Sequence, residues 1–81
     1  MRIARGEAFQ VSLVDLDGVI GGHDATSEQL LVVLGGRVRC ATRDEEAELG
    51  VGEAVAWREG EWHETRSLEA SRLLLIEGAF Q

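Results

Sequence analysis

The chain has 81 residues, a mass of 8.8 kDa and a formal net charge of −7. This length has room for one domain, residues 1–81, with a small core. An apolar share of 44% is typical of a folded globular protein and argues against disorder. The acidic balance, with no cluster of Lys or Arg, excludes nucleic acid as an expected partner.

The first residues contain no apolar segment of the kind found in signal peptides, and no apolar run approaches the roughly 18 residues that span a bilayer. We therefore expect a cytoplasmic protein without a membrane partner.

In chain order, apolar residues recur with period two or in short unbroken runs, each ended by glycine or by charged residues, which indicates strands and turns. One segment, residues 25–28, has helical character but is too short to be stable as a helix. Many short strands, about 8 to 10, predict an all-β sandwich or small barrel. The expected strands with clear apolar patterns are Phe9–Leu16, Val19–Ile20, Leu30–Leu34, Val38–Cys40, Ala47–Leu49, Ala54–Trp57 and Leu73–Ile76.

The segment around Val38 alternates charged and apolar residues. Arg37 and Arg39 are expected on a solvent-exposed or ion-paired face, while Val38 and Cys40 are expected to be buried. Cys40 is the only cysteine, so no intrachain disulfide forms, and we interpret it as a small buried hydrophobe.

A glycine-rich segment ending in a histidine carries the most specific motif. Gly52, Arg58, Gly60 and His63 have the spacing of the second cupin motif, with Arg58 at the position of its proline. The segment 57–64, Trp-Arg-Glu-Gly-Glu-Trp-His-Glu, is also similar to one found in small bacterial cupins of unassigned function. The chain thus resembles a small single-domain cupin of the RmlC-like superfamily from Phe9 to Gly78. The resemblance implies a jelly-roll barrel, also called a double-stranded β-helix.

The first cupin motif, at about residues 21–36, is only partly present, and the second lies at about 52–67. If the first motif ends at Gly36, then Gln29 takes the position of its glutamate and His23 that of its first histidine. If it ends at Gly35, Glu28 takes the glutamate position and His23 that of the second histidine. Neighbouring residues on a strand face opposite ways, so only one of Glu28 and Gln29 can face the interior.

The resemblance implies a divalent metal, Zn, Fe, Mn or Ni, inside the barrel. The candidate ligands are His23 and His63, together with Glu28 or, in the other register, Gln29. Two imidazoles and a carboxylate leave open positions for substrate, whereas an amide in place of the carboxylate makes a weak site. If Gln29 takes the glutamate position, the sequence therefore predicts a weak metal site or none.

Three further side chains are predicted near His63. Gln29 and Trp57 are expected in the pocket, where an indole supplies apolar area and one N–H donor. Glu61 shares the strand parity of His63 and is a candidate partner for its imidazole. Trp62 has the opposite parity and is expected in packing.

Two function classes follow. The first is a barrel that binds a small molecule with a weak or absent metal. The alternative is a metal-dependent oxygenase or isomerase with a two-His-one-carboxylate site. A homodimer is expected in either case, because exchange of N-terminal strands between two chains covers exposed edges and supplements a small core.

Overall fold

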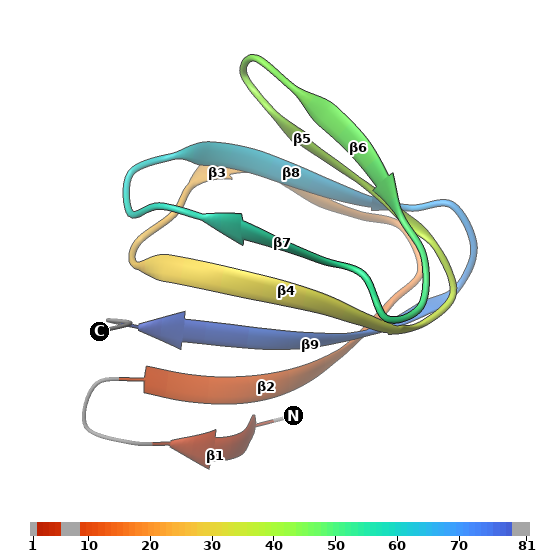
Figure 1. The fold of residues 1–81 in the computed structure, drawn as a ribbon, viewed down its shortest axis with the longest axis horizontal. Helices are drawn as coiled ribbons and strands as arrows, with labels where there is room; N and C mark the ends of the chain where they lie inside the picture. The colour runs from red at the N-terminus through yellow and green to blue at the C-terminus, as the bar shows by residue number, and fades with distance from the viewer. Residues whose placement is uncertain (1, 6–8, 79–81) are drawn as a thin grey trace.

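The computed structural model describes residues 2–5 and 9–78, without the side chains of residues 2–5 and 23. This part of the chain forms nine strands and no helix (Figure 1). The strands are β1 (Arg2–Arg5), β2 (Phe9–Leu16), β3 (Val19–Asp24), β4 (Glu28–Gly35), β5 (Val38–Thr42), β6 (Glu46–Leu49), β7 (Ala54–Trp57), β8 (Trp62–Ser67) and β9 (Ser71–Gly78).

The strands form two antiparallel sheets that face each other. The five-stranded sheet has the order β1-β2-β9-β4-β7, and the four-stranded sheet has the order β3-β8-β5-β6. The chain crosses between the sheets six times, and β1 with β2 and β5 with β6 are the consecutive strands that pair directly. This is a jelly-roll barrel, and it confirms the all-β prediction.

The inner faces of the two sheets form one hydrophobic core. Its completely buried side chains are Val33 on β4, Val38 on β5 and Leu73 on β9, which come from both sheets. Alternation along each strand places these residues inward. The buried members of the core are Leu31, Val33, Val38, Cys40, Leu49, Trp57 and Leu73.

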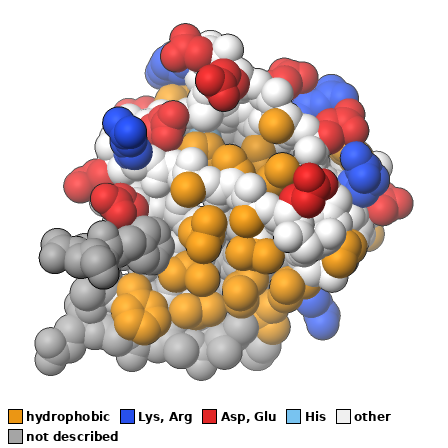
Figure 2. All heavy atoms as spheres, viewed as in Figure 1, with side chains coloured by type: hydrophobic (Ala, Val, Ile, Leu, Met, Phe, Trp, Pro, Cys, Tyr) orange, Lys and Arg blue, Asp and Glu red, His pale blue; other side chains and the backbone are white. Residues whose placement is uncertain are grey.

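The outer face of the five-stranded sheet is also apolar. Cross-strand partners share a face, and the register gives two complete apolar rows across β2, β9, β4 and β7. Figure 2 shows hydrophobic side chains gathered over these strands. We call this surface the outer apolar face; its residues are Phe9, Val11, Leu13, Leu30, Val32, Leu34, Ala54, Ala56, Leu74 and Ile76.

The outer face of the four-stranded sheet is charged. Glu48 accepts hydrogen bonds from Arg39 (2.7 Å) and Arg37 (3.3 Å), and Arg39 lies 3.6 Å from Glu46. The hydrogen bond from Arg39 is the main cause of a lowered pKa at Glu48, with Arg37 adding to it. The charged face predicted around Val38 is therefore ion-paired, and Cys40 is buried as predicted. Burial raises the pKa of the Cys40 thiol.

The turn between β4 and β5 carries the chain from one sheet to the other. Gly36 in this turn has a φ of +80°, which an L side chain rarely adopts. A Cβ at this position would overlap Ser71 and lie 2.5 Å from the backbone oxygen of Ala70. Only glycine fits this crossing without displacement of β9.

Two strands lie outside the predicted set. β8 carries a polar sequence, Trp-His-Glu-Thr-Arg-Ser, and β1 is only four residues long. The segment 25–28 forms no helix, because the N–H of Ala25 donates to Glu61 O (2.9 Å) and its carbonyl accepts from Gly60 N (2.7 Å). These two hydrogen bonds hold Ala25 against the β7–β8 turn.

Candidate ligand cavity

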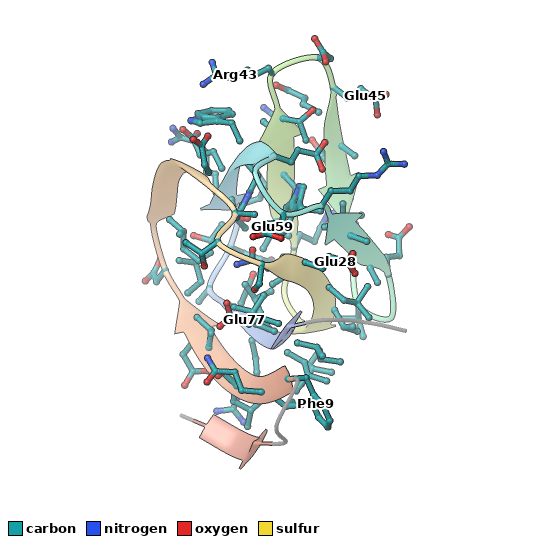
Figure 3. All side chains as sticks on the ribbon, turned by 90° about the vertical axis from the view of Figure 1, so that its left-hand side faces the viewer. Phe9, Glu28, Arg43, Glu45, Glu59 and Glu77 are labelled. Atoms are coloured by element: carbon teal, nitrogen blue, oxygen red, sulfur yellow. The ribbon has the colours of Figure 1, made fainter. Side chains whose placement is uncertain are left out.

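A cavity of about 240 Å³ lies between the two sheets. Its polar part lies toward the end of the barrel that carries the β3–β4 and β7–β8 connections, where it is lined by Thr26, Gln29 and Glu77. Figure 3 views this end, with Glu77 between the sheets and Glu28 further out. The cavity is lined by Val14, Ile20, Thr26, Gln29, Leu31, Trp57, His63, Thr65, Leu73, Leu75 and Glu77.

One row of cross-strand partners supplies most of the polar wall. Gln10 on β2 pairs with Glu77 on β9, Glu77 pairs with Gln29 on β4, and Gln29 pairs with Trp57 on β7. Because directly opposite residues share a face, all four side chains lie on the inner side of the five-stranded sheet.

Glu77 is the centre of this row. Its Oε1 accepts a hydrogen bond from Gln10 Nε2 (3.0 Å), and its Oε2 accepts one from Gln29 Nε2 (3.2 Å). A carboxylate oxygen only accepts, so each amide must turn its NH₂ toward Glu77. The carbonyl oxygens of the two glutamines are therefore directed away from these hydrogen bonds, and this wall is rich in acceptors.

His63 on β8 faces the row from the other sheet. It is 3% exposed, and its Nδ1 lies 3.3 Å from the backbone oxygen of Glu61. A carbonyl cannot donate, so Nδ1 carries the proton in this hydrogen bond. Its imidazole stacks on Trp57, with ring centroids 4.1 Å apart and an interplanar angle of 15°.

Trp57 thus joins the two sheets at the cavity. The ring is 4% exposed, and within the described part of the chain its Nε1–H is buried without a hydrogen-bond partner. A buried donor of this kind costs free energy unless a water or ligand accepts from it.

The two histidines lie on paired strands. The register of β3 and β8 sets His23 directly opposite His63. The side chain of His23 lies outside the described residues, so the structure relates the two histidines through their backbones.

The predicted carboxylate and amide separate as strand parity requires. Gln29 is 6% exposed and lines the cavity, whereas Glu28 is exposed and lies on the opposite face of β4. This arrangement corresponds to the register in which Gln29 takes the glutamate position of the first motif.

Glu61 and Trp62 complete the predicted set. The Glu61 carboxylate accepts from the backbone N–H of Arg58 (3.1 Å), so the residue contacts His63 through its carbonyl and not through its side chain. Trp62 lies on the other face of β8, and the Arg43 guanidinium is 5.3 Å from the centroid of its ring. A Cβ at Gly22 would overlap the Trp62 ring, which therefore packs directly on the β3 backbone.

The described side chains, which do not include that of His23, do not by themselves complete the metal site that the sequence resemblance implies. Among the residues that the structure describes, no three His, Cys, Asp or Glu side chains form a group suited to a metal ion. Glu28 lies on the face of β4 opposite to the cavity.

Sequence reasoning missed Glu77. The predicted last strand ended at Ile76, one residue before it. A signal was present, because Leu73, Leu75 and Glu77 alternate along β9 and a carboxylate in an inward series is costly unless it has partners.

A second, open depression of about 400 Å³ lies at the other end of the barrel, beside the β2–β3, β4–β5 and β8–β9 turns. Its polar side chains include Asp15, Asp17, Ser71 and Arg72. The Arg72 guanidinium in this depression pairs with Asp15 at 3.0 Å.

No family model and no curated protein matches the chain. Solved structures match it over nearly its whole length. A protein with a cupin-2 domain from Shewanella frigidimarina is 25% identical, with a TM-score of 0.87, and the match covers 98% of this chain and 78% of that one. A protein from Neisseria meningitidis is 29% identical, with a TM-score of 0.84 and coverage of 98% and 81%.

A cupin superfamily protein from Desulfitobacterium hafniense has a higher TM-score, 0.89, at 18% identity, with coverage of 99% of this chain and 75% of that one. At this identity the likeness concerns the fold. The chain thus has the fold of the small cupins.

The cupin fold hosts many activities, so its presence alone assigns none of them. Within the described residues, no helix is long and apolar enough to cross a membrane. The function of this cupin therefore has to be argued from the cavity.

Proposed function

We propose that this cupin binds a small molecule in its barrel and recognises the hydrogen-bond donors of that molecule, with a preference for an ammonium group. The observation that carries the proposal is the pair of amides from Gln10 and Gln29 that both donate to Glu77. This arrangement turns one N–H of each amide toward the carboxylate, so the carbonyl oxygen of each amide is left to accept from a ligand.

The charge of the cavity supports a cation. Among the described residues that line it, Glu77 is the only one with a formal charge. Its two amide partners are neutral, so they solvate the carboxylate without neutralising it. An ammonium group would supply the opposite charge and hydrogen-bond donors for the acceptors of the wall, whereas an anion would be repelled.

The size of the cavity limits the ligand. At roughly 30 Å³ for each water in the liquid, about 240 Å³ corresponds to about eight waters. This is below the roughly 300 Å³ at which pockets for drug-sized ligands begin. The ligand is therefore a compact molecule, and the buried Trp57 Nε1–H favours one that also carries an acceptor, such as a hydroxyl group.

Three probes of matched size test the proposal: ethanolamine, ethylene glycol and glycolate, which differ mainly in charge. We expect ethanolamine to perturb the amide NMR signals of Gln29, Trp57 and His63 at the lowest concentration and glycolate at the highest. Glu77→Gln should weaken ethanolamine binding about tenfold or more, which corresponds to about 1.4 kcal/mol.

Glu28→Gln is the matched control, because it removes the same charge from the outer face of the neighbouring strand. It should leave the order of the three probes unchanged. Tightest binding of glycolate would contradict the ammonium preference, and no response at the cavity to any of the three would contradict the binding site itself.

A bound divalent ion is the second candidate, and the pairing of His23 with His63 favours it. Elemental analysis of chain purified without chelator tests it. Metal near one ion per chain that is lost in His63→Ala would support this candidate, and its loss in Glu28→Ala would support the two-His-one-carboxylate site. With Glu28 on the outer face, we expect Glu28→Ala to have no effect on metal content.

The proposal also covers the location, the oligomeric state and the partners of the protein. We expect a cytoplasmic homodimer that acts on a small molecule rather than on nucleic acid or a membrane. The net charge of −7 supports the exclusion of nucleic acid, because it opposes contact with phosphates.

A further inference from the structure

A second, smaller hollow lies beside the ligand cavity, between the β5–β6 hairpin and β7. Its volume is about 60 Å³, which corresponds to about two waters in the liquid. β6 and β7 are edge strands of the two sheets, and Glu46 and Ala47 on β6 are exposed, so the hollow lies at the surface on this side of the barrel. We call it the side hollow; its residues are Cys40, Thr42, Glu45, Glu46, Ala47, Val55 and Trp57.

On the four-stranded sheet, the boundary between the cavity and the side hollow follows the strand register. His63 and Thr65 on β8 line the cavity. Their cross-strand partners on β5, Thr42 and Cys40, line the side hollow. Cys40 Sγ lies 3.8 Å from Thr65 Oγ1, so the two walls are in contact here. The boundary therefore runs between β8 and β5.

On the five-stranded sheet, the boundary runs between β4 and β7. Leu31 on β4 lines the cavity, and its cross-strand partner Val55 on β7 lines the side hollow. Trp57 lies two residues beyond Val55 on the same face of β7, and among the described residues it alone lines both spaces. Its ring is 4% exposed and stacks on His63 of the opposite sheet, with centroids 4.1 Å apart. The indole thus reaches across the barrel between the two spaces.

We infer that Trp57 is a specificity-determining residue of this cavity and that its ring limits the length of the ligand. The inference rests on the proposed binding of a small molecule and names the part of the wall that sets its size. Glu77 and Trp57 lie in one cross-strand row, two strand spacings or about 9.6 Å apart. An ammonium group held at Glu77 therefore leaves room for a short molecule before the ring. Without the indole, the cavity and the side hollow form one passage toward β6.

The contacts of the ring are suited to this role. Within the described part of the chain, the Trp57 Nε1–H makes no hydrogen bond, so the ring is held by packing and by its stack on His63. A smaller apolar residue in its place breaks no hydrogen bond of the described residues and leaves space instead. Leu31 and Val55 on the two sides of the boundary are apolar. An alkyl chain fits such a space, because burial of each methylene group is favourable.

The test compares ethanolamine with 8-aminooctan-1-ol, a longer amino alcohol, by NMR titration of the full chain. In the wild type, the longer probe should leave the amide signals of Ala47 and Val55 unchanged. In Trp57→Ala it should perturb them together with those of Gln29 and Thr65. The ratio of its Kd to that of ethanolamine should fall at least about tenfold in this variant. Trp57→Leu keeps an apolar side chain, should shift the ratio in the same direction, and tests the inference even if Trp57→Ala does not fold.

Leu49→Ala is the matched control. Leu49 is a buried member of the same hydrophobic core, but it lines neither the cavity nor the side hollow. This variant also removes a buried side chain, yet it should leave the Kd ratio at the wild-type value. Circular dichroism with thermal unfolding would show which of the three variants are folded.

Octan-1-ol, which has no ammonium group, separates this inference from the proposed function. If ethanolamine does not bind in the cavity, the proposed function fails, whereas octan-1-ol should still perturb Ala47 and Val55 in Trp57→Leu and not in the wild type. Signals of Ala47 and Val55 that respond to an eight-carbon probe in the wild type would overturn the inference. So would an unchanged Kd ratio and unchanged signals in a folded Trp57 variant, or an equal shift in Leu49→Ala.

Discussion

The two sheets of the barrel share one core but differ on their outer faces. Both sheets contribute inward apolar residues to the core, but the five-stranded sheet is apolar on its outer face, whereas the four-stranded sheet is ion-paired there through Arg37, Arg39 and Glu48. Both sheets thus satisfy the same packing requirement inside. The outer faces differ. The charged face of the four-stranded sheet is suited to contact with water, and the apolar face of the five-stranded sheet is suited to contact with a protein partner.

The largest expected effect is on the free energy of unfolding, and two adjacent residues on the inner and outer sides of β9 allow it to be measured. Leu73 is completely buried, and Leu74 belongs to the outer apolar face. Leu73→Ala should lower the free energy of unfolding by about 2–5 kcal/mol, because it leaves a cavity in the core. Urea unfolding at protein concentrations low enough for a monomer would measure it.

Leu74→Ala is the paired variant in that experiment. At the same low concentration it should change the free energy of unfolding by at most about 1 kcal/mol, as expected for a side chain that is partly in contact with solvent. Equal losses for the two variants would mean that the outer face is as tightly packed within the monomer as the core. That outcome would remove the difference between the sheets.

The crossing between the sheets is the site of the next largest effect. Gly36→Ala should destabilise the protein by at least about 2 kcal/mol, because it combines a positive φ with overlap against Ser71. Gly52 has a similar φ of +86°, and no atom lies within 4 Å of the Cβ that alanine would add there.

Gly52→Ala should therefore cost only the backbone strain, about 1 kcal/mol. The difference between the two thermal unfolding experiments measures the crowding at the β4–β5 crossing. A Gly52→Ala variant as unstable as Gly36→Ala would show that crowding against β9 adds nothing.

The smallest effect is expected on the charged outer face. The pKa of Glu48 is lowered mainly by the hydrogen bond from Arg39. A lowered pKa in the folded state adds stability above the ordinary value of about 4.5 and loses it as the pH falls through the folded-state pKa. Glu48→Gln should thus be slightly less stable than wild type at pH 7, with the difference shrinking as the pH falls below 4.5.

Urea unfolding of both proteins at pH 7, 4.5 and 3 would measure this dependence. The side chains are exposed, so the effect is small, and added salt should reduce it further. A difference that grows as the pH falls would contradict the assigned sign.

The fold was predictable wherever the apolar pattern was strong. The seven predicted apolar runs lie in β2, β3, β4, β5, β6, β7 and β9, because a strand with a buried face places apolar residues on that face. β8 was missed as an explicit strand because its inward residues, His63 and Thr65, are polar. Its burial depends on the opposite sheet, which the local sequence does not contain.

The candidate site was predictable in part. The alternation of side chains along a strand predicted that Glu28 and Gln29 face opposite ways, as they do. Trp57 was expected in the pocket, and it lines the cavity. Glu77 was not found, because its partners Gln10 and Gln29 are 67 and 48 residues away in the chain. The register of three strands joins these side chains, and register is a property of the assembled sheet.

The position of β9 has a consequence for how the molecule is made. This strand follows all the others in the chain, yet it lies in the middle of the five-stranded sheet, between β2 and β4. During synthesis, β2 and β4 must remain unpaired along these edges until β9 emerges, and long-range pairing of this kind is slow. Glu77, Leu74 and Ile76 all lie on β9, so the cavity and the outer apolar face are completed in the same step of folding.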